Sequence, residues 1–192
     1  FDARWARNLP ILFLAGRAVS ARMSANMGTF LLHAGRAITP NEEIHDASIL
    51  VRVGVIEGVG PRSSVTAPAR IQEILEPDCI SVPGFVDIHI HGAGGHDVME
   101  GQSAALSAAA ACVARNGTTS MVATTVSAST EETVRSVAGI ADYILQQHAR
   151  RGISAGAQAE ILGIHFEGPF LSPTRRGAHL AEALKSTSTE LL

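Results

Sequence analysis

One apolar stretch that ends in two histidines constrains the fold more than any other part of the chain. Residues 82–92 read VPGFVDIHIHG, and more glycines follow directly. This pattern predicts a buried strand. Since side chains alternate across a strand, Asp87, His89 and His91 would share one face while the apolar row packs under helices. A lone histidine is usually an ordinary polar residue, but two imidazoles on one face can bind one metal ion.

The composition is typical of a globular protein without a strong electrostatic partner. The 192 residues are 46% hydrophobic, with 15 Lys and Arg against 18 Asp and Glu and a net charge of -3, which allows a sizeable core. Nothing here indicates nucleic acid or a membrane surface, so an anionic substrate must be bound by local groups. Cys79 and Cys112 are too few for a disulfide framework, which favours the cytoplasm. No stretch is long enough to span a bilayer.

Three regions are predicted along the chain. Residues 1–28 start without Met and mix arginines with one short apolar run, so we expect a disordered lead or a reading-frame remnant, with a signal peptide as the alternative. Residues 29–82 contain short apolar runs separated by Gly, Pro and Asn, which predict a small antiparallel sheet or sandwich. We expect no chemistry in that region and assign its His33 and His45 to the solvated surface.

Residues 83–192 alternate between helix and strand patterns, which is typical of βα units around a parallel sheet. The pattern predicts a helix at 102–116 that stops at Gly117 and strands at 119–126 and 160–167. A second helix is predicted from a capping box at Ser129 and Glu132 to Gly152. Its apolar stripe is expected to consist of Val134, Val137, Ala141, Ile144 and Leu145.

The third predicted strand of this region carries His165 and Glu167 on one face. Glu167 comes at the carboxyl end of the strand, where active sites of parallel α/β folds gather. A carboxylate there is costly unless it is metal-bound or paired, and Arg175 or Arg176 is the alternative partner. His165 is expected one layer deeper, as a hydrogen-bonding residue behind the metal ligands. On the following loop, His179 is either a substrate contact or an exposed histidine.

Four motifs together resemble those of the N-acetylglucosamine-6-phosphate deacetylases, within the metal-dependent amidohydrolase superfamily. They are PGFVDIHIHG at 83–92, GTT at 117–119, GIHFEGPF at 163–170 and RGAH at 176–179. The first motif is shared across the superfamily, whereas HFEGPF followed by GAH is more specific. The resemblance covers residues 29 to about 184.

The resemblance implies a (β/α)8 barrel beside a small β-sandwich, of which this chain would hold the sandwich strands and the first three βα units. His89, His91 and Glu167 would bind one or two divalent ions of zinc, iron or manganese. His179 would contact the substrate near its amide, and Ala178 would help to position the sugar. The substrate would be an amino-sugar phosphate, and the full-length enzyme would be a homodimer.

The implied reaction is hydrolysis of the acetamide of N-acetylglucosamine 6-phosphate to glucosamine 6-phosphate and acetate. A complete barrel needs roughly 250 residues, so we expect a truncated barrel at 83–192, with the catalytic aspartate beyond Leu192 and no catalysis by this chain alone. Two alternatives remain open. One is a dihydroorotase-like or allantoinase-like enzyme, which would favour a lysine ligand on a later strand over Glu167. The other is a non-catalytic fragment.

Overall fold

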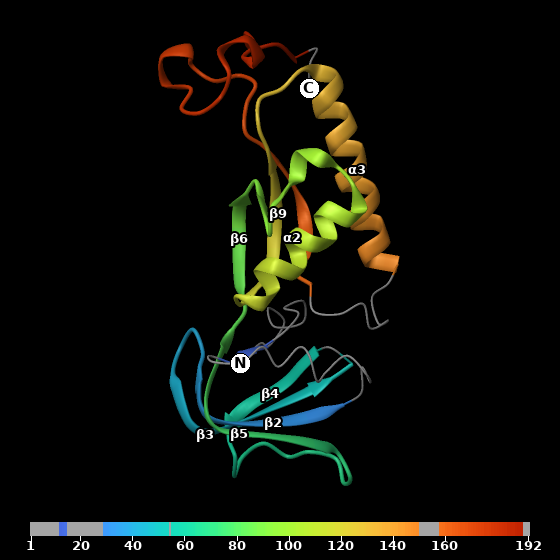
Figure 1. The fold of residues 1–192 in the computed structure, drawn as a ribbon. Helices are drawn as coiled ribbons and strands as arrows, with labels where there is room; N and C mark the ends of the chain where they lie inside the picture. The colour runs from blue at the N-terminus through green and yellow to red at the C-terminus, as the bar shows by residue number, and fades with distance from the viewer. Residues whose placement is uncertain (1–11, 15–28, 54, 150–157, 190–192) are drawn as a thin grey trace. The chain divides into compact units, whose positions relative to one another are not determined.

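The structure is a computed structural model that describes residues 12–14, 29–53, 55–149 and 158–189. They divide into two compact units, the first built mainly on residues up to Val86 and the second mainly on residues from Asp87 onward (Figure 1). Within the predicted lead at 1–28, the described part is Leu12–Leu14, which forms strand β1 and pairs antiparallel with residues 81–83. The remainder of that prediction lies outside the described residues.

A five-stranded sheet forms the first unit, in the order β1-β5-β2-β3-β4. Its strands after β1 are β2 (Phe30–Ile38), β3 (Glu43–Arg52), β4 (Val55–Pro61) and β5 (Gln72–Pro83). β2, β3 and β4 pair antiparallel, as predicted, but β5 runs parallel to β2. The prediction of an antiparallel sheet was therefore wrong for the pair of β2 and β5. A parallel neighbour requires a crossover connection, and the spacing of short apolar runs does not report one.

His33 is buried, so its assignment to the solvated surface was wrong. Its Nδ1 lies 2.7 Å from the hydroxyl of Ser48, and its Nε2 lies 3.2 Å from the carboxylate of Glu73. β2 lies between β5 and β3, and its first five residues are all buried. The imidazole is tolerated there because both ring nitrogens have polar partners. His45 is exposed, as expected.

A three-stranded sheet in the order β10-β9-β6 forms the centre of the second unit, with a short β7-β8 hairpin beside it in sequence. Its elements are β6 (Phe85–Ile90), β7 (Gly92–Ala93), β8 (His96–Asp97), α2 (Ser103–Arg115), β9 (Thr118–Thr125), α3 (Thr130–Ala149) and β10 (Glu160–Phe166). The 3₁₀ turns are η2 (Val98–Glu100), η3 (Pro173–Arg175) and η4 (Ala181–Ala183). The predicted alternation of strand and helix is confirmed, although the described strands do not by themselves make a barrel.

β6 and β9 run parallel, because their contacts advance together along both strands. The amide of Phe85 donates to the carbonyl of Gly117 at 2.9 Å, and the amide of Ile90 donates to the hydroxyl of Thr124 at 3.2 Å. The connection between the two strands includes α2, as a parallel pair requires. The carboxyl ends of β6 and β9 therefore lie at one edge of the sheet.

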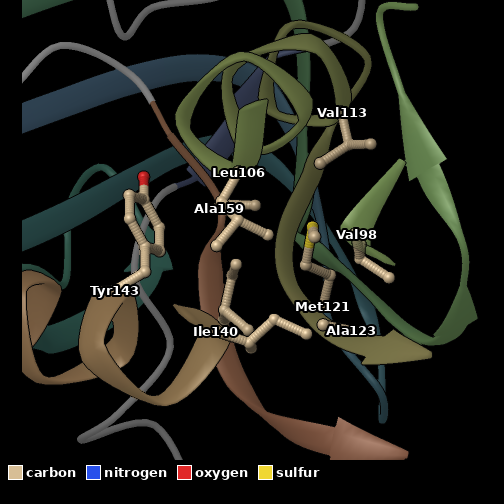
Figure 2. Packing of buried hydrophobic residues seen from close by; sticks show 9 residues of the cluster. Val98, Leu106, Val113, Met121, Ala123, Ile140, Tyr143 and Ala159 are labelled. Atoms are coloured by element: carbon tan, nitrogen blue, oxygen red, sulfur yellow. The ribbon is translucent and has the colours of Figure 1, made fainter. Parts of the chain in front are cut away.

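The two helices pack on the sheet through one apolar cluster (Figure 2). Its fully buried members include Leu106 of α2, Met121 of β9, Ile140 of α3 and Ile161 of β10. The predicted helix boundaries agree with the structure to within a residue or two where they are described. Gly117 has a φ of 95°, a conformation that glycine adopts easily after the end of α2.

The start of α3 is the predicted capping box. The amide of Glu132 donates to the hydroxyl of Ser129 at 3.2 Å, and the amide of Ser129 donates to the Glu132 carboxylate at 3.1 Å. The helix is described as far as Ala149, so the predicted stop at Gly152 lies outside the described residues.

The predicted buried face of α3 was right only in part: Ile144 packs against the core cluster and Val137 is half-buried, but Val134, Ala141 and Leu145 are exposed. The buried residues are Ser136, Ile140 and Tyr143, whereas Val134 and Leu145 are 63% and 66% exposed. Ser136 can lie inside because its hydroxyl donates to backbone carbonyls, at 2.9 Å in the case of Glu132.

The row of apolar residues along β6 is also more exposed than the prediction of a buried strand allows. Val86 is 46% exposed and Ile88 is 72% exposed, while Ile90 packs against the core cluster. β6 is an edge strand of the three-stranded sheet, so its outer side has no neighbouring strand within the described residues. In the described part of the chain, no helix combines the length and the apolar character needed to cross a membrane.

Candidate metal centre

The predicted ligands converge where β6, β9 and β10 end. His89 is in β6, His91 follows it directly, and Glu167 follows directly after β10. The amide of Glu167 donates to the carbonyl of Thr125 at 3.3 Å, which holds the end of β10 against the end of β9. Strand direction thus places side chains that are far apart in sequence at one edge of the sheet.

Three potential ligand atoms are close enough together to share one metal ion. Oε2 of Glu167 lies 3.2 Å from Nε2 of His89 and 3.0 Å from Nε2 of His91, and the two nitrogens are 3.3 Å apart. Zinc binds such atoms at about 2.0–2.2 Å, so two of its ligands are typically about 3–3.5 Å from each other. The observed spacing fits a single ion between the three side chains.

The hydrogen bonding of His91 strengthens this interpretation. Its Nδ1 lies 2.9 Å from the backbone carbonyl of Thr124, which can only accept, so Nδ1 carries a proton. In the neutral ring, Nε2 then has no proton, and its lone pair faces the carboxylate of Glu167. Two electron-rich groups 3.0 Å apart repel unless a cation or a proton lies between them. A carbonyl behind the ring is also the usual way in which a metal-binding histidine is oriented.

Glu167 is ionised at neutral pH. Burial raises its pKa, but the hydrogen bond and charge of His179 and the charges of His89 and His91 outweigh burial, so the pKa lies below its ordinary value. The alternative partners predicted for Glu167 were arginines. Arg176 instead donates to the backbone carbonyl of His179, and the side chains found close to the Glu167 carboxylate are histidines.

His179 lies against the other oxygen of the same carboxylate. Its Nε2 is 3.4 Å from Oε1 of Glu167, and its side chain is only 8% exposed. Its Nδ1 accepts from the backbone amide of Ser127 at 3.1 Å. Ala178 is exposed in the turn before it, which the amide of His179 closes by donating to Arg176. The loop therefore brings His179 against Glu167, while Ala178 is exposed.

His165 is exposed rather than one layer deeper. Its ring centroid is 5.0 Å from that of His89, and its Nδ1 is 3.5 Å from the hydroxyl of Thr124, at the outer limit of a hydrogen bond. It contacts the cluster, but its ring is not one of the three converging ligand groups.

Sequence reasoning missed the polar end of β9. Thr124 orients His91 through its carbonyl, Thr125 accepts from the Glu167 amide, and Ser127 contacts His179. The signal was the row of hydroxyl residues at the carboxyl end of a strand, TTVS at 124–127, next in order to the HIH strand. In a parallel sheet such residues are candidates for the same site as the neighbouring strand ends.

Comparisons with known proteins identify a family and relatives of this chain. Residues 80–191 match the amidohydrolase family. The chain is 32% identical over 155 residues to the N-acetylglucosamine-6-phosphate deacetylase of Bacillus subtilis (strain 168). It is also 32% identical over 157 residues to the N-acetylgalactosamine-6-phosphate deacetylase of Escherichia coli O157:H7. These alignments take in 80% and 82% of this chain but 37% and 38% of the two relatives.

Solved structures give the same coverage. The N-acetyl-D-glucosamine-6-phosphate deacetylase of Mycobacterium smegmatis is similar with a TM-score of 0.67 and 29% identity, over 84% of this chain and 39% of that one. The N-acetylglucosamine-6-phosphate deacetylase of Pasteurella multocida shares the fold with a TM-score of 0.72 at 24% identity, over 85% of this chain and 40% of that one. The chain thus spans about two fifths of the length of these relatives.

Proposed function

This chain belongs to the amidohydrolase family, and from that premise we propose that it forms part of an N-acetylglucosamine-6-phosphate deacetylase. The reaction would hydrolyse the acetamide of the sugar to give glucosamine 6-phosphate and acetate. The observation that carries the proposal is the position of the His91 ring, whose Nε2 is 3.0 Å from Oε2 of Glu167 while its Nδ1 is 2.9 Å from the Thr124 carbonyl. Such an arrangement is favourable when a cation binds, and amide hydrolysis by this family needs one.

Nε2 of His89, Nε2 of His91 and Oε2 of Glu167 would hold the divalent ion. When bound, the ion would lower the pKa of a coordinated water and polarise the amide carbonyl. Zinc, iron and manganese all accept imidazole and carboxylate, so the donor set does not select among them. A second ion is compatible with the histidine pair but is not required by it.

The residues of this chain would do three things around that centre. Thr124 would hold His91 in the tautomer that binds metal, through the carbonyl 2.9 Å from Nδ1. His179 would donate from Nε2 to the acyl oxygen of the substrate, where negative charge develops. Ala178 would lie beside the sugar in the turn. The carboxylate that moves a proton to the departing amine is assigned to an aspartate beyond Leu192.

The proposal extends to the architecture and setting. Residues 29–82 would be strands of a β-sandwich, and residues 83–192 would be the first part of a (β/α)8 barrel. The relatives' lengths support this, because the aligned part is about 37% of the Bacillus subtilis deacetylase. The complete enzyme would be a cytoplasmic homodimer. Its substrate would be a small amino-sugar phosphate.

Metal binding tests the first half of the proposal. The chain would be stripped with EDTA and titrated with Zn²⁺, Mn²⁺ and Fe²⁺ by calorimetry, the last under anaerobic conditions. We expect close to one ion per chain, lost in the His91→Ala and Glu167→Ala variants and retained in His45→Ala, a control on an exposed histidine of the first unit. Metal binding that survives Glu167→Ala would favour the dihydroorotase-like alternative.

A chimera tests the second half. Residues 29–189 of this chain would replace the aligned stretch of the Bacillus subtilis enzyme, and acetate release would be measured with the 6-phosphates of N-acetylglucosamine and N-acetylgalactosamine. We expect the glucosamine derivative to be the better substrate and the Glu167→Gln chimera to be inactive. A folded, metal-loaded chimera that hydrolyses neither sugar would contradict the proposal and favour the non-catalytic alternative.

A further inference from the structure

Ser127 contacts His179 through two of its groups, although 52 positions separate them. The backbone nitrogen of Ser127 is 3.1 Å from Nδ1 of the ring, and its hydroxyl oxygen is 2.9 Å from the same atom. Both side chains are well covered, since Ser127 and the His179 side chain are each 8% exposed. Contacts of this kind inside a covered region hold the ring in one orientation.

The backbone contact decides which ring nitrogen carries the proton. An amide N–H can only donate, so Nδ1 of His179 must accept and cannot be protonated when the ring is neutral. The proton is then on Nε2, the nitrogen that is 3.4 Å from Oε1 of Glu167. The hydroxyl of Ser127 can donate to the same lone pair and reinforces this choice.

Gly168 leaves the space that the Ser127 hydroxyl occupies. A Cβ at position 168 would lie 2.0 Å from Oγ of Ser127, and the φ of Gly168 is 90°, in the region that favours glycine. Because Gly168 directly follows Glu167, the serine hydroxyl lies between the metal-binding strand end and the loop that carries His179. The Ser127 side chain thus contacts both His179 and the backbone that follows Glu167.

We infer that Ser127 is a positioning residue that holds His179 as the tautomer protonated on Nε2, with that N–H directed into the candidate site. Its meaning for catalysis rests on the proposed function, since the donated proton would serve the acyl oxygen of the substrate. The tautomer itself is a property of the folded chain and can be measured without any turnover.

The test is a long-range ¹H–¹⁵N correlation spectrum of this chain labelled at histidine, recorded at pH 8, above the ordinary histidine pKa of about 6.5. The His179 signals would be assigned with His179→Gln. We expect the Nε2-protonated form to dominate in the wild type. In Ser127→Ala, the ratio of the Nδ1-protonated form to the Nε2-protonated form should rise about fivefold, the effect of losing one hydrogen bond.

Ser127→Thr keeps the hydroxyl and should restore the wild-type ratio, and Ser81→Ala, which removes a buried hydroxyl of the first unit, should leave it unchanged. A wild-type ring protonated on Nδ1 would overturn the inference, whether or not any variant folds. A Ser127→Ala spectrum identical to the wild type would overturn the role of the side chain. An inactive chimera would contradict the deacetylase proposal but would not change the tautomer measured for His179. Failure of the proposed function and failure of this inference can therefore be told apart.

Discussion

Replacing Glu167 by glutamine should stabilise the metal-free protein and abolish its stabilisation by zinc. The two side chains have the same shape, and the oxygen that faces His179 remains an acceptor. The new amide group would stand where Oε2 lies, 3.0 Å from Nε2 of His91. That nitrogen carries a lone pair and can accept a hydrogen bond, because the proton of the neutral ring is on Nδ1, which donates to the Thr124 carbonyl. The substitution therefore exchanges a repulsion for a hydrogen bond.

Glu167→Gln should raise the free energy of unfolding in EDTA and lower it, relative to the wild type, in the presence of zinc. A neutral hydrogen bond contributes about 0.5–1.5 kcal/mol, so the free energy of unfolding of Glu167→Gln in EDTA at pH 8 should rise by about that amount. Zinc at 100 times its dissociation constant should add about 2.7 kcal/mol to the wild type. The variant should gain little, because a neutral amide is a poor zinc ligand.

Urea denaturation of both proteins, with EDTA and with zinc, measures these four free energies. Glu43→Gln is the matched control, because it removes the charge of an exposed glutamate paired with Arg36 and should leave the zinc effect intact. A loss of 3–5 kcal/mol in EDTA, the range typical of a broken buried ion pair, would mean that Glu167 neutralises a fixed positive charge. That result, or an unchanged response to zinc, would refute the reasoning about the His91 lone pair.

Three further predictions concern the folded chain. Ile140→Ala should lower the free energy of unfolding by about 2–5 kcal/mol, because Ile140 is fully buried. Val134→Ala, on the exposed face of the same helix, should change it by less than about 0.5 kcal/mol. Equal effects of the two substitutions in urea denaturation would contradict the assignment of the buried face. Ser81→Ala should raise the free energy of unfolding by about 1 kcal/mol, because the Ser81 hydroxyl is buried with no hydrogen-bond partner among the described residues; a loss measured in the same assay would reveal a partner. The hydrogen bonds from the side chain and backbone of Ser129 lower the pKa of Glu132. The ionised Glu132 side chain therefore stabilises the fold above the ordinary glutamate pKa of about 4.3, and this stabilisation is lost as the pH falls through the lowered value. Hydrogen exchange at the start of α3 should speed up over that pH range in the wild type, and the same pH dependence in a Glu132→Gln variant would exclude this cause.

Features that depend on neighbours in sequence were predictable. The capping box of Ser129 and Glu132 and the stop at Gly117 involve groups within four residues of each other, so the order of residues is enough to specify them. The βα alternation and the strand ends at His91 and Glu167 follow from hydrophobic periodicity in the same way. These signals place the candidate ligands at strand ends without any knowledge of the packing.

The face that a helix or strand buries was less predictable. On α3 the apolar residues Val134 and Leu145 are exposed, while Ser136 is inside because a backbone carbonyl accepts its hydroxyl proton. In the first unit, His33 is buried because Ser48 and Glu73, distant in sequence, contact its two nitrogens. Hydropathy ranks a side chain by its cost in an apolar medium, and a distant hydrogen-bond partner removes that cost.

By itself, the sequence determined which residues are candidate ligands: two histidines and a glutamate at predicted strand ends, in motifs that resemble those of metal-dependent amidohydrolases. Only the tertiary structure decided which atoms of these residues face one another and which protons they carry. The Thr124 carbonyl selects the tautomer of His91, and the Ser127 amide selects that of His179. Both selecting groups belong to the polypeptide backbone, which every residue type carries. Which backbone groups contact the two histidine rings is therefore set by the way in which β6, β9 and β10 pair in space. The residue types alone do not specify these contacts.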